Sequence, residues 1–123
     1  MFNYTHNTGA PVTKGDYLGE FELVVLLALA RLDKAAYGMS IYDEILDTTG
    51  RDVSIQAVYV TLNRLEKKGY VTSQVGDATD DRGGRPRKYY SLGPIGVTAL
   101  RISRAMYDSL WAGVRLKTGT TRS

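Results

Sequence analysis

The chain has 123 residues, of which 43% are hydrophobic and 24% charged, and its formal net charge is +3. This size and composition indicate one globular domain. It contains no cysteine, which excludes a disulfide framework, a thiolate metal site and a cysteine nucleophile. Residues 1–81 hold 7 Lys/Arg against 12 Asp/Glu, whereas residues 82–123 hold 9 Lys/Arg against one Asp/Glu, an asymmetry that suggests a polyanionic partner. With neither a signal peptide nor an apolar run of about 20 residues, we expect a cytoplasmic protein that does not enter a membrane.

The first part of the chain predicts a flexible tail followed by two helices. Residues 1–15 are polar and show no period, and we expect them, like residues 118–123, to be flexible. Residues 18–32 are apolar on nearly every side of the expected helix, which indicates a buried central helix. Residues 37–46 have a helical apolar period and end near Gly50, a residue that favours a helix stop.

A third helix is predicted over residues 54–68. Ser54 is a good N-cap, and Gly69 can adopt the left-handed conformation that ends a helix. One face is apolar and is expected to be buried; it consists of Ile55, Val58, Tyr59, Leu62 and Leu65. The other face carries amide and guanidinium groups of the kind that read base edges, with an exposed valine that can meet a thymine methyl. The alternative is an ordinary solvated helix face. The residues of this helix predicted to contact DNA are Ser54, Gln56, Tyr59, Val60, Asn63, Arg64 and Lys67.

Two β-strands are expected next, over residues 70–75 and 87–92, because both segments are rich in β-branched and aromatic residues. Two helices joined by a short turn and followed by a hairpin make a winged helix-turn-helix, here predicted over residues 16–92. The aspartates of the loop between the strands lack the spacing of a calcium loop, so neither a metal nor a cofactor is expected. Four cations of this wing are predicted to bind phosphates or the minor groove: Arg82, Arg85, Arg87 and Lys88. The alternative is a solvated turn.

The last helix is expected to begin at Gly93-Pro94 and to run to about residue 116, within a segment covering residues 93–117. This helix has two adjacent apolar stripes, and together they are too wide for its own small domain to cover. We therefore expect a symmetric homodimer; the alternative is a helix folded back over its own domain. The residues assigned to the dimer interface are Ile102, Met106, Tyr107, Leu110, Trp111 and Val114. The predicted fold class is thus mostly α with a small two-stranded β-wing and a long C-terminal dimerisation helix.

Four motifs in this order resemble the PadR family of bacterial transcriptional regulators over about residues 18–116. They are Tyr37-Gly38, Ser54-x-x-x-Val-Tyr-x-x-Leu-x-Arg-Leu-Glu66, Lys68-Gly69, and Gly84-Arg-Pro-Arg-Lys-Tyr-Tyr-Ser-Leu-Gly-Pro-x-Gly96. The single C-terminal helix resembles the short subfamily. The resemblance implies a dimeric winged-helix repressor that binds a palindromic operator and is released by a small aromatic effector. It also implies a central pore in which Trp111 of each subunit stacks a planar ligand; the alternative is that Trp111 only packs the interface.

The sequence departs from the family pattern in the third helix and before the last. Gln56-Ala-Val58 replaces the commoner Gly-Thr-Leu, and Val60 replaces Pro or Thr, so base specificity cannot be carried over. Gly93 replaces the usual Thr, a small loss in helix capping. We expect a repressor of its own or a neighbouring transporter or detoxification operon, and not an enzyme. The alternative is a winged helix that binds another protein without sequence-specific DNA binding.

Overall fold

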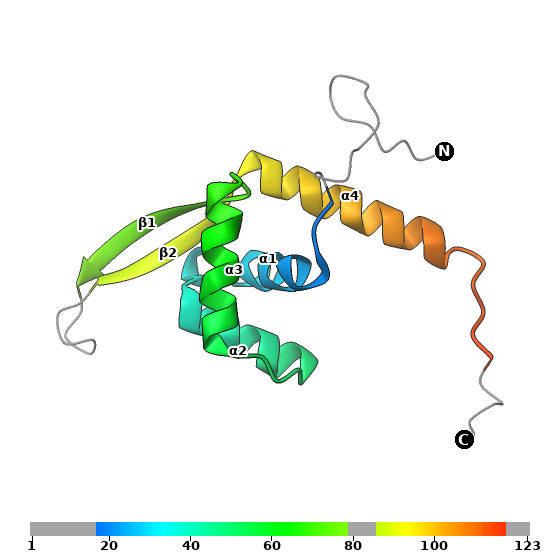
Figure 1. The fold of residues 1–123 in the computed structure, drawn as a ribbon, viewed down its shortest axis with the longest axis horizontal. Helices are drawn as coiled ribbons and strands as arrows, with labels where there is room; N and C mark the ends of the chain where they lie inside the picture. The colour runs from blue at the N-terminus through cyan, green and yellow to red at the C-terminus, as the bar shows by residue number, and fades with distance from the viewer. Residues whose placement is uncertain (1–16, 79–85, 118–123) are drawn as a thin grey trace.

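The computed structural model describes residues 17–78 and 86–117, without the side chains of residues 77 and 78. Three helices, α1 (Glu20–Leu32), α2 (Gly38–Thr49) and α3 (Ile55–Lys67), precede a hairpin of β1 (Val71–Ala78) and β2 (Pro86–Leu92), and the short 3-10 helix η2 (Asp33–Ala35) joins α1 to α2. The chain continues into α4 (Pro94–Trp111). The hairpin leaves the helical body on one side and α4 extends toward the other (Figure 1). This is the winged helix-turn-helix predicted from the sequence.

Local capping signals set most of the helix boundaries. The Ser54 hydroxyl accepts a hydrogen bond from the Ala57 N–H at 3.0 Å, so α3 begins where the sequence predicted. Gly50 and Gly69 have φ angles of 69° and 85°, a region that favours glycine, and they follow the ends of α2 and α3. Pro94 occupies the first turn of α4, where backbone N–H groups have no acceptor within the helix, so the absence of an N–H in proline costs no hydrogen bond.

The core lies where α1, α2 and α3 meet the first residues of the wing. Its fully buried aliphatic side chains come from all three helices and from β1, and they are Val25, Leu26, Leu29, Ile41, Ile45, Val58, Leu62, Leu65 and Val71. α1 is indeed central, but Leu27 on it is 47% exposed, so residues 17–78 and 86–117 leave one side of this helix open.

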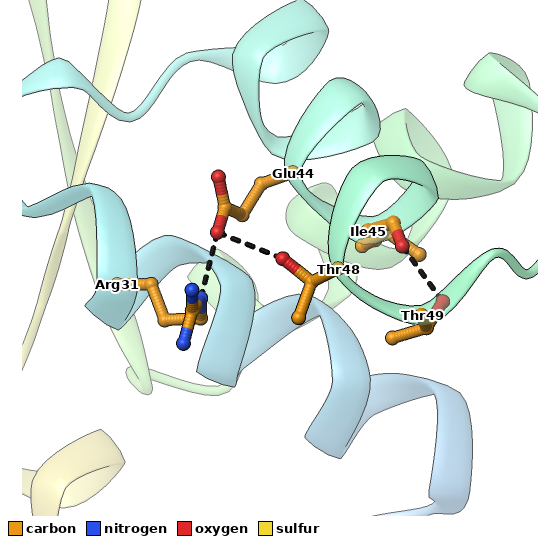
Figure 2. Close-up of polar contacts among 5 residues, drawn as sticks. All are labelled: Arg31, Glu44, Ile45, Thr48 and Thr49. Atoms are coloured by element: carbon orange, nitrogen blue, oxygen red, sulfur yellow. Dashed lines mark hydrogen bonds and ion pairs between the residues drawn. The ribbon is translucent and has the colours of Figure 1, made fainter.

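An ion pair joins α1 to α2 on the outside of this core. The Arg31 Nε donates to the Glu44 carboxylate at 2.6 Å, and the Thr48 hydroxyl donates to the same oxygen at 3.0 Å (Figure 2). The Arg31 hydrogen bond, followed by that of Thr48, lowers the pKa of the Glu44 carboxyl from its ordinary value. A glutamate on a helix can thus hold one cation and one hydroxyl together, an arrangement that recurs at the wing.

The wing is an antiparallel hairpin attached to the helical body at its base. Val71 pairs with Leu92 and Val75 with Lys88, and the register shifts between Val75 and Ala78. The Tyr90 N–H donates to the Ala36 carbonyl at 2.8 Å, which ties β2 to the chain just before α2. The orientation of the hairpin relative to the helices is therefore set by hydrogen bonds at its base.

α4 is shorter than predicted. It ends at Trp111, because Gly113 has a φ of 77° and the Val114 N–H turns back to the Trp111 carbonyl at 2.9 Å. The expectation that the helix runs to about residue 116 is wrong, and Val114 lies beyond it. At the other end, a Cβ on Gly96 would overlap the Tyr70 carbonyl, so glycine lets α4 pack directly on the backbone before β1. Within the described part of the chain, no helix is long and apolar enough to cross a membrane.

Candidate nucleic-acid interface

The outer face of α3 is open to solvent along its whole length. All seven residues of this helix assigned to DNA contact are exposed in the single chain: Ser54, Gln56, Tyr59, Val60, Asn63, Arg64 and Lys67. Val60 is 56% exposed, so its methyl groups are accessible to a partner. The face that carries the groups able to read bases is thus not packed inside the domain, and in Figure 1 α3 crosses in front of α1.

Tyr59 differs from its predicted placement on the buried face. The side chain is 46% exposed, and its ring lies against Gly38 at the start of α2, where a Cβ would overlap the ring. The residue that fills the core in its vicinity is Thr61, which is only 4% exposed. The helical period predicted which side of α3 is buried, but it could not show that a glycine on another helix provides a separate place for the ring.

A groove of about 440 Å³ brings the predicted helix and wing residues together. It lies between the start of α2, the outer side of α3 and the return strand β2. Its lining residues are Tyr37, Gly38, Met39, Tyr59, Asn63, Pro86, Arg87, Lys88 and Tyr90. Four of these residues, Tyr59, Asn63, Arg87 and Lys88, were assigned to DNA contact from the sequence. Tyr37 and Met39 were not, although the Tyr37-Gly38 motif pointed to this segment.

The two described cations of the wing are held on opposite faces of β2, because side chains alternate along a strand. The Arg87 guanidinium lies 4.2 Å from the centroid of the Tyr37 ring, which in turn meets Tyr89 edge to face at 5.6 Å. Lys88 turns toward α3, where its Nζ lies 3.2 Å from the Glu66 Oε1. Arg82 and Arg85, the other two predicted wing cations, lie outside the described residues.

The buried Glu22 carboxylate lies at the centre of a charge cluster that the sequence did not predict, whose two cations are half exposed. The Glu22 side chain accepts from the Gly19 N–H at 2.9 Å and from the Lys68 Nζ at 3.0 Å, and it lies 3.9 Å from the Arg64 guanidinium. Burial alone would raise the pKa of the Glu22 carboxyl, but the hydrogen bonds from Gly19 and Lys68 outweigh it and the pKa is lowered. The cluster links the start of α1 to the end of α3. It also draws Arg64 partly toward the domain's own surface.

The second half of α4 presents an apolar surface that none of the described residues covers. Ile102 is only 9% exposed and Met106 is partly buried, whereas Tyr107, Leu110 and Trp111 are 42%, 67% and 59% exposed. Ile102 therefore packs against its own domain, contrary to its assignment to the dimer interface. A groove of about 490 Å³ runs between α1 and α4, and its apolar lining is Leu23, Leu27, Leu100 and Tyr107.

The fold and the groove between α3 and β2 together define a winged-helix protein of the class that binds duplex DNA. The sequence profile of the transcriptional regulator PadR-like family matches residues 25–102. The chain belongs to this family, whose members are DNA-binding transcriptional regulators.

Several individual proteins are also similar to this chain. An uncharacterized protein of Lysinibacillus sphaericus is 34% identical over 80 residues, which span 63% of this chain and 69% of the relative. The crystal structure of a PadR family transcriptional regulator from Eggerthella lenta is similar with a TM-score of 0.60 at 29% identity, over 76% of this chain and 81% of that one. A PadR family transcription regulator from Clostridium difficile shares the fold, with a TM-score of 0.63 at 22% identity over 76% and 93% of the two chains.

Proposed function

We propose that the protein is a cytoplasmic homodimeric repressor that binds a palindromic operator near its own gene or a neighbouring transporter or detoxification operon. The observation that carries this proposal is the shared groove between α3 and β2, which Asn63, Arg87 and Lys88 all line. An amide is suited to base edges and a cation to phosphates, so one groove combines sequence reading with backbone binding. Two such units, held by a dimer axis, would enter major grooves about 34 Å apart.

The uncovered side of α4 supports the homodimer. Contiguous apolar surface of this kind is rare on monomers and usually marks an interaction site. Leu110 and Trp111 lie next to one another at the end of the helix, and Leu27 and Tyr107 line the groove beside it. A second copy presents the same surface, so an isologous contact between the two α4 helices would cover both.

Trp111 supports a binding place for a planar aromatic effector at the same interface. It is the only tryptophan of the chain and is 59% exposed before dimerisation. An effector acts on DNA binding only to the extent that it prefers one arrangement of the two subunits over the other. Quenching of tryptophan fluorescence by planar aromatic compounds, in parallel with release from operator DNA, tests this role. Release without quenching would place the effector elsewhere.

The function is tested by gel shift of the region upstream of the gene, with an unrelated duplex of equal length as competitor. A regulator retains the upstream fragment in excess competitor. A winged helix that binds only another protein shows no preference between the two duplexes.

A further inference from the structure

Glu66 connects α3 to both strands of the wing. It lies in the last turn of α3, on the side that carries Tyr59 and Asn63, because residues three, four and seven apart share a helical face. Its Oε2 accepts a hydrogen bond from the Ser73 hydroxyl on β1, and its Oε1 lies 3.2 Å from the Lys88 Nζ on β2. One carboxylate thus holds a hydroxyl from one strand and a cation from the other.

The charges of this link are fixed at neutral pH. The hydrogen bond from Ser73, and after it that from Lys88, lowers the pKa of the Glu66 carboxyl, and the hydrogen bond to Glu66 raises the pKa of Lys88. The Lys88 Nζ also lies 5.6 Å from the centroid of the Tyr90 ring, which favours the ammonium form. The lysine is therefore positively charged but already has a negative partner.

Lys88 is also a lining residue of the groove between α3 and β2 and is nearly half exposed, so the same ammonium can be approached by a phosphate. A phosphate that takes this ammonium must displace Glu66 or share the lysine with it. Either way, the carboxylate brings a second negative charge close to the phosphate. We propose that Glu66 is a positioning residue that restrains Lys88 and competes with DNA phosphates for it, so that it weakens binding to duplex DNA regardless of sequence.

The competition has a consequence for the salt dependence of binding. A free lysine that neutralises one phosphate contributes about 0.9 to the slope of log K against log salt. Whether Lys88 leaves Glu66 or is shared with it, the carboxylate is a negative charge beside the DNA that retains a counterion there. The net release of ions through Lys88 is then close to zero. Replacing Lys88 should change the slope little while Glu66 is present and by about 0.9 once Glu66 is neutral.

The test uses Glu66→Gln, which keeps an oxygen able to accept from Ser73 but removes the charge. We expect the variant to bind random duplex about threefold more tightly at 50 mM salt, with a slope steeper by about 0.9. Glu44→Gln is the matched control, because Glu44 also holds one hydroxyl and one cation but pairs with Arg31 on α1 (Figure 2). Its effect measures the change in net charge alone.

Lys88→Met provides the second arm. Glu66→Gln in the Lys88→Met background should have no more effect than Glu44→Gln. A gain that persists without Lys88, or a Glu66→Gln variant that binds no better than Glu44→Gln, would overturn the role of Glu66. Should Glu66→Gln not fold, as judged by thermal unfolding, a slope that falls by about 0.9 in Lys88→Met alone would also overturn it. The inference rests on the proposed function, and a wild-type protein that fails to bind any duplex would refute both, whereas failure of the variants alone leaves the regulator intact.

Discussion

Leu110→Glu should separate the subunits without unfolding them. Leu110 is 67% exposed in the single chain, so its replacement removes little packing within the subunit. In the proposed dimer the side chain faces the partner's α4, where a carboxylate would lose its water. The same position occurs twice in an isologous interface, so each loss counts twice.

The size of the effect follows from the exposed fraction. Burying a whole leucine side chain contributes roughly 1.5–3 kcal/mol, and two-thirds of it is available for burial at Leu110. Two copies then contribute about 2–4 kcal/mol, which corresponds to a roughly 30- to 700-fold weaker dimer. The desolvation of two glutamates adds to this loss, so the larger value is the better guide.

Sedimentation equilibrium measures the change directly. The wild-type protein should be a dimer at micromolar concentration, and Leu110→Glu a monomer with an unchanged far-ultraviolet circular dichroism spectrum. Thr98→Glu is the matched control, because it places the same charge on an exposed position of the first half of α4. Equal dimer affinities of Leu110→Glu and the wild type would refute the assignment of this surface.

Three further substitutions test other parts of the account. Asn63→Ala should cost about 1–3 kcal/mol on the operator and little on random duplex, as measured by fluorescence anisotropy, because an exposed amide that reads a base edge contributes only to the correct sequence; equal losses on both would contradict base reading. Gly38→Ala should displace the half-exposed Tyr59 ring but change the free energy of unfolding by less than about 1 kcal/mol. DNA binding should weaken about fivefold, which is the value of the one hydrogen bond to DNA expected from the Tyr59 hydroxyl. A large loss of stability with unchanged DNA binding would oppose this view. Glu22→Gln should lower the free energy of unfolding by about 1 kcal/mol at pH 7. The expected loss is this small because Lys68 is half exposed and solvent weakens its ion pair with Glu22. Because the pKa of Glu22 is lowered in the folded state, this stabilisation is present above the ordinary pKa of a glutamate and is lost as the pH falls through the lower pKa of the folded state, so the denaturant curves of the two proteins should converge as the solution is acidified; a stability difference that does not shrink with falling pH would exclude the charge cluster as its source.

The parts of the fold that could be predicted from the sequence are those that depend on local chemistry. A helix boundary is set by residues within one turn of it. The structure begins α3 after Ser54, ends α2 before Gly50 and begins α4 at Pro94, as the sequence predicted. The outer face of α3 was likewise predictable, because with 3.6 residues per turn most of its apolar residues fall on one face and its polar residues on the other. The family resemblance was confirmed, and with it the winged-helix fold.

The remaining features depend on contacts between distant segments. Glu22 lies in a segment that the sequence marks as apolar on nearly every side, and only the packing of α1 against the end of α3 brings Lys68 to it. Glu66 was quoted as part of a motif, but its two partners come from strands whose register had to be known first. The end of α4 was misjudged because apolar residues continue past Gly113, and the apolar period did not show that the chain turns there.

The central claim is that a pair of these chains binds duplex DNA through α3 and the wing. DNase I footprinting of the purified protein on the region upstream of its gene tests this claim most directly. We predict two protected half-sites with inverted sequence, centred about one helical turn apart on the same side of the duplex. Protection of unrelated duplex at the same concentration, or no protection at concentrations where the protein is a dimer, would contradict it.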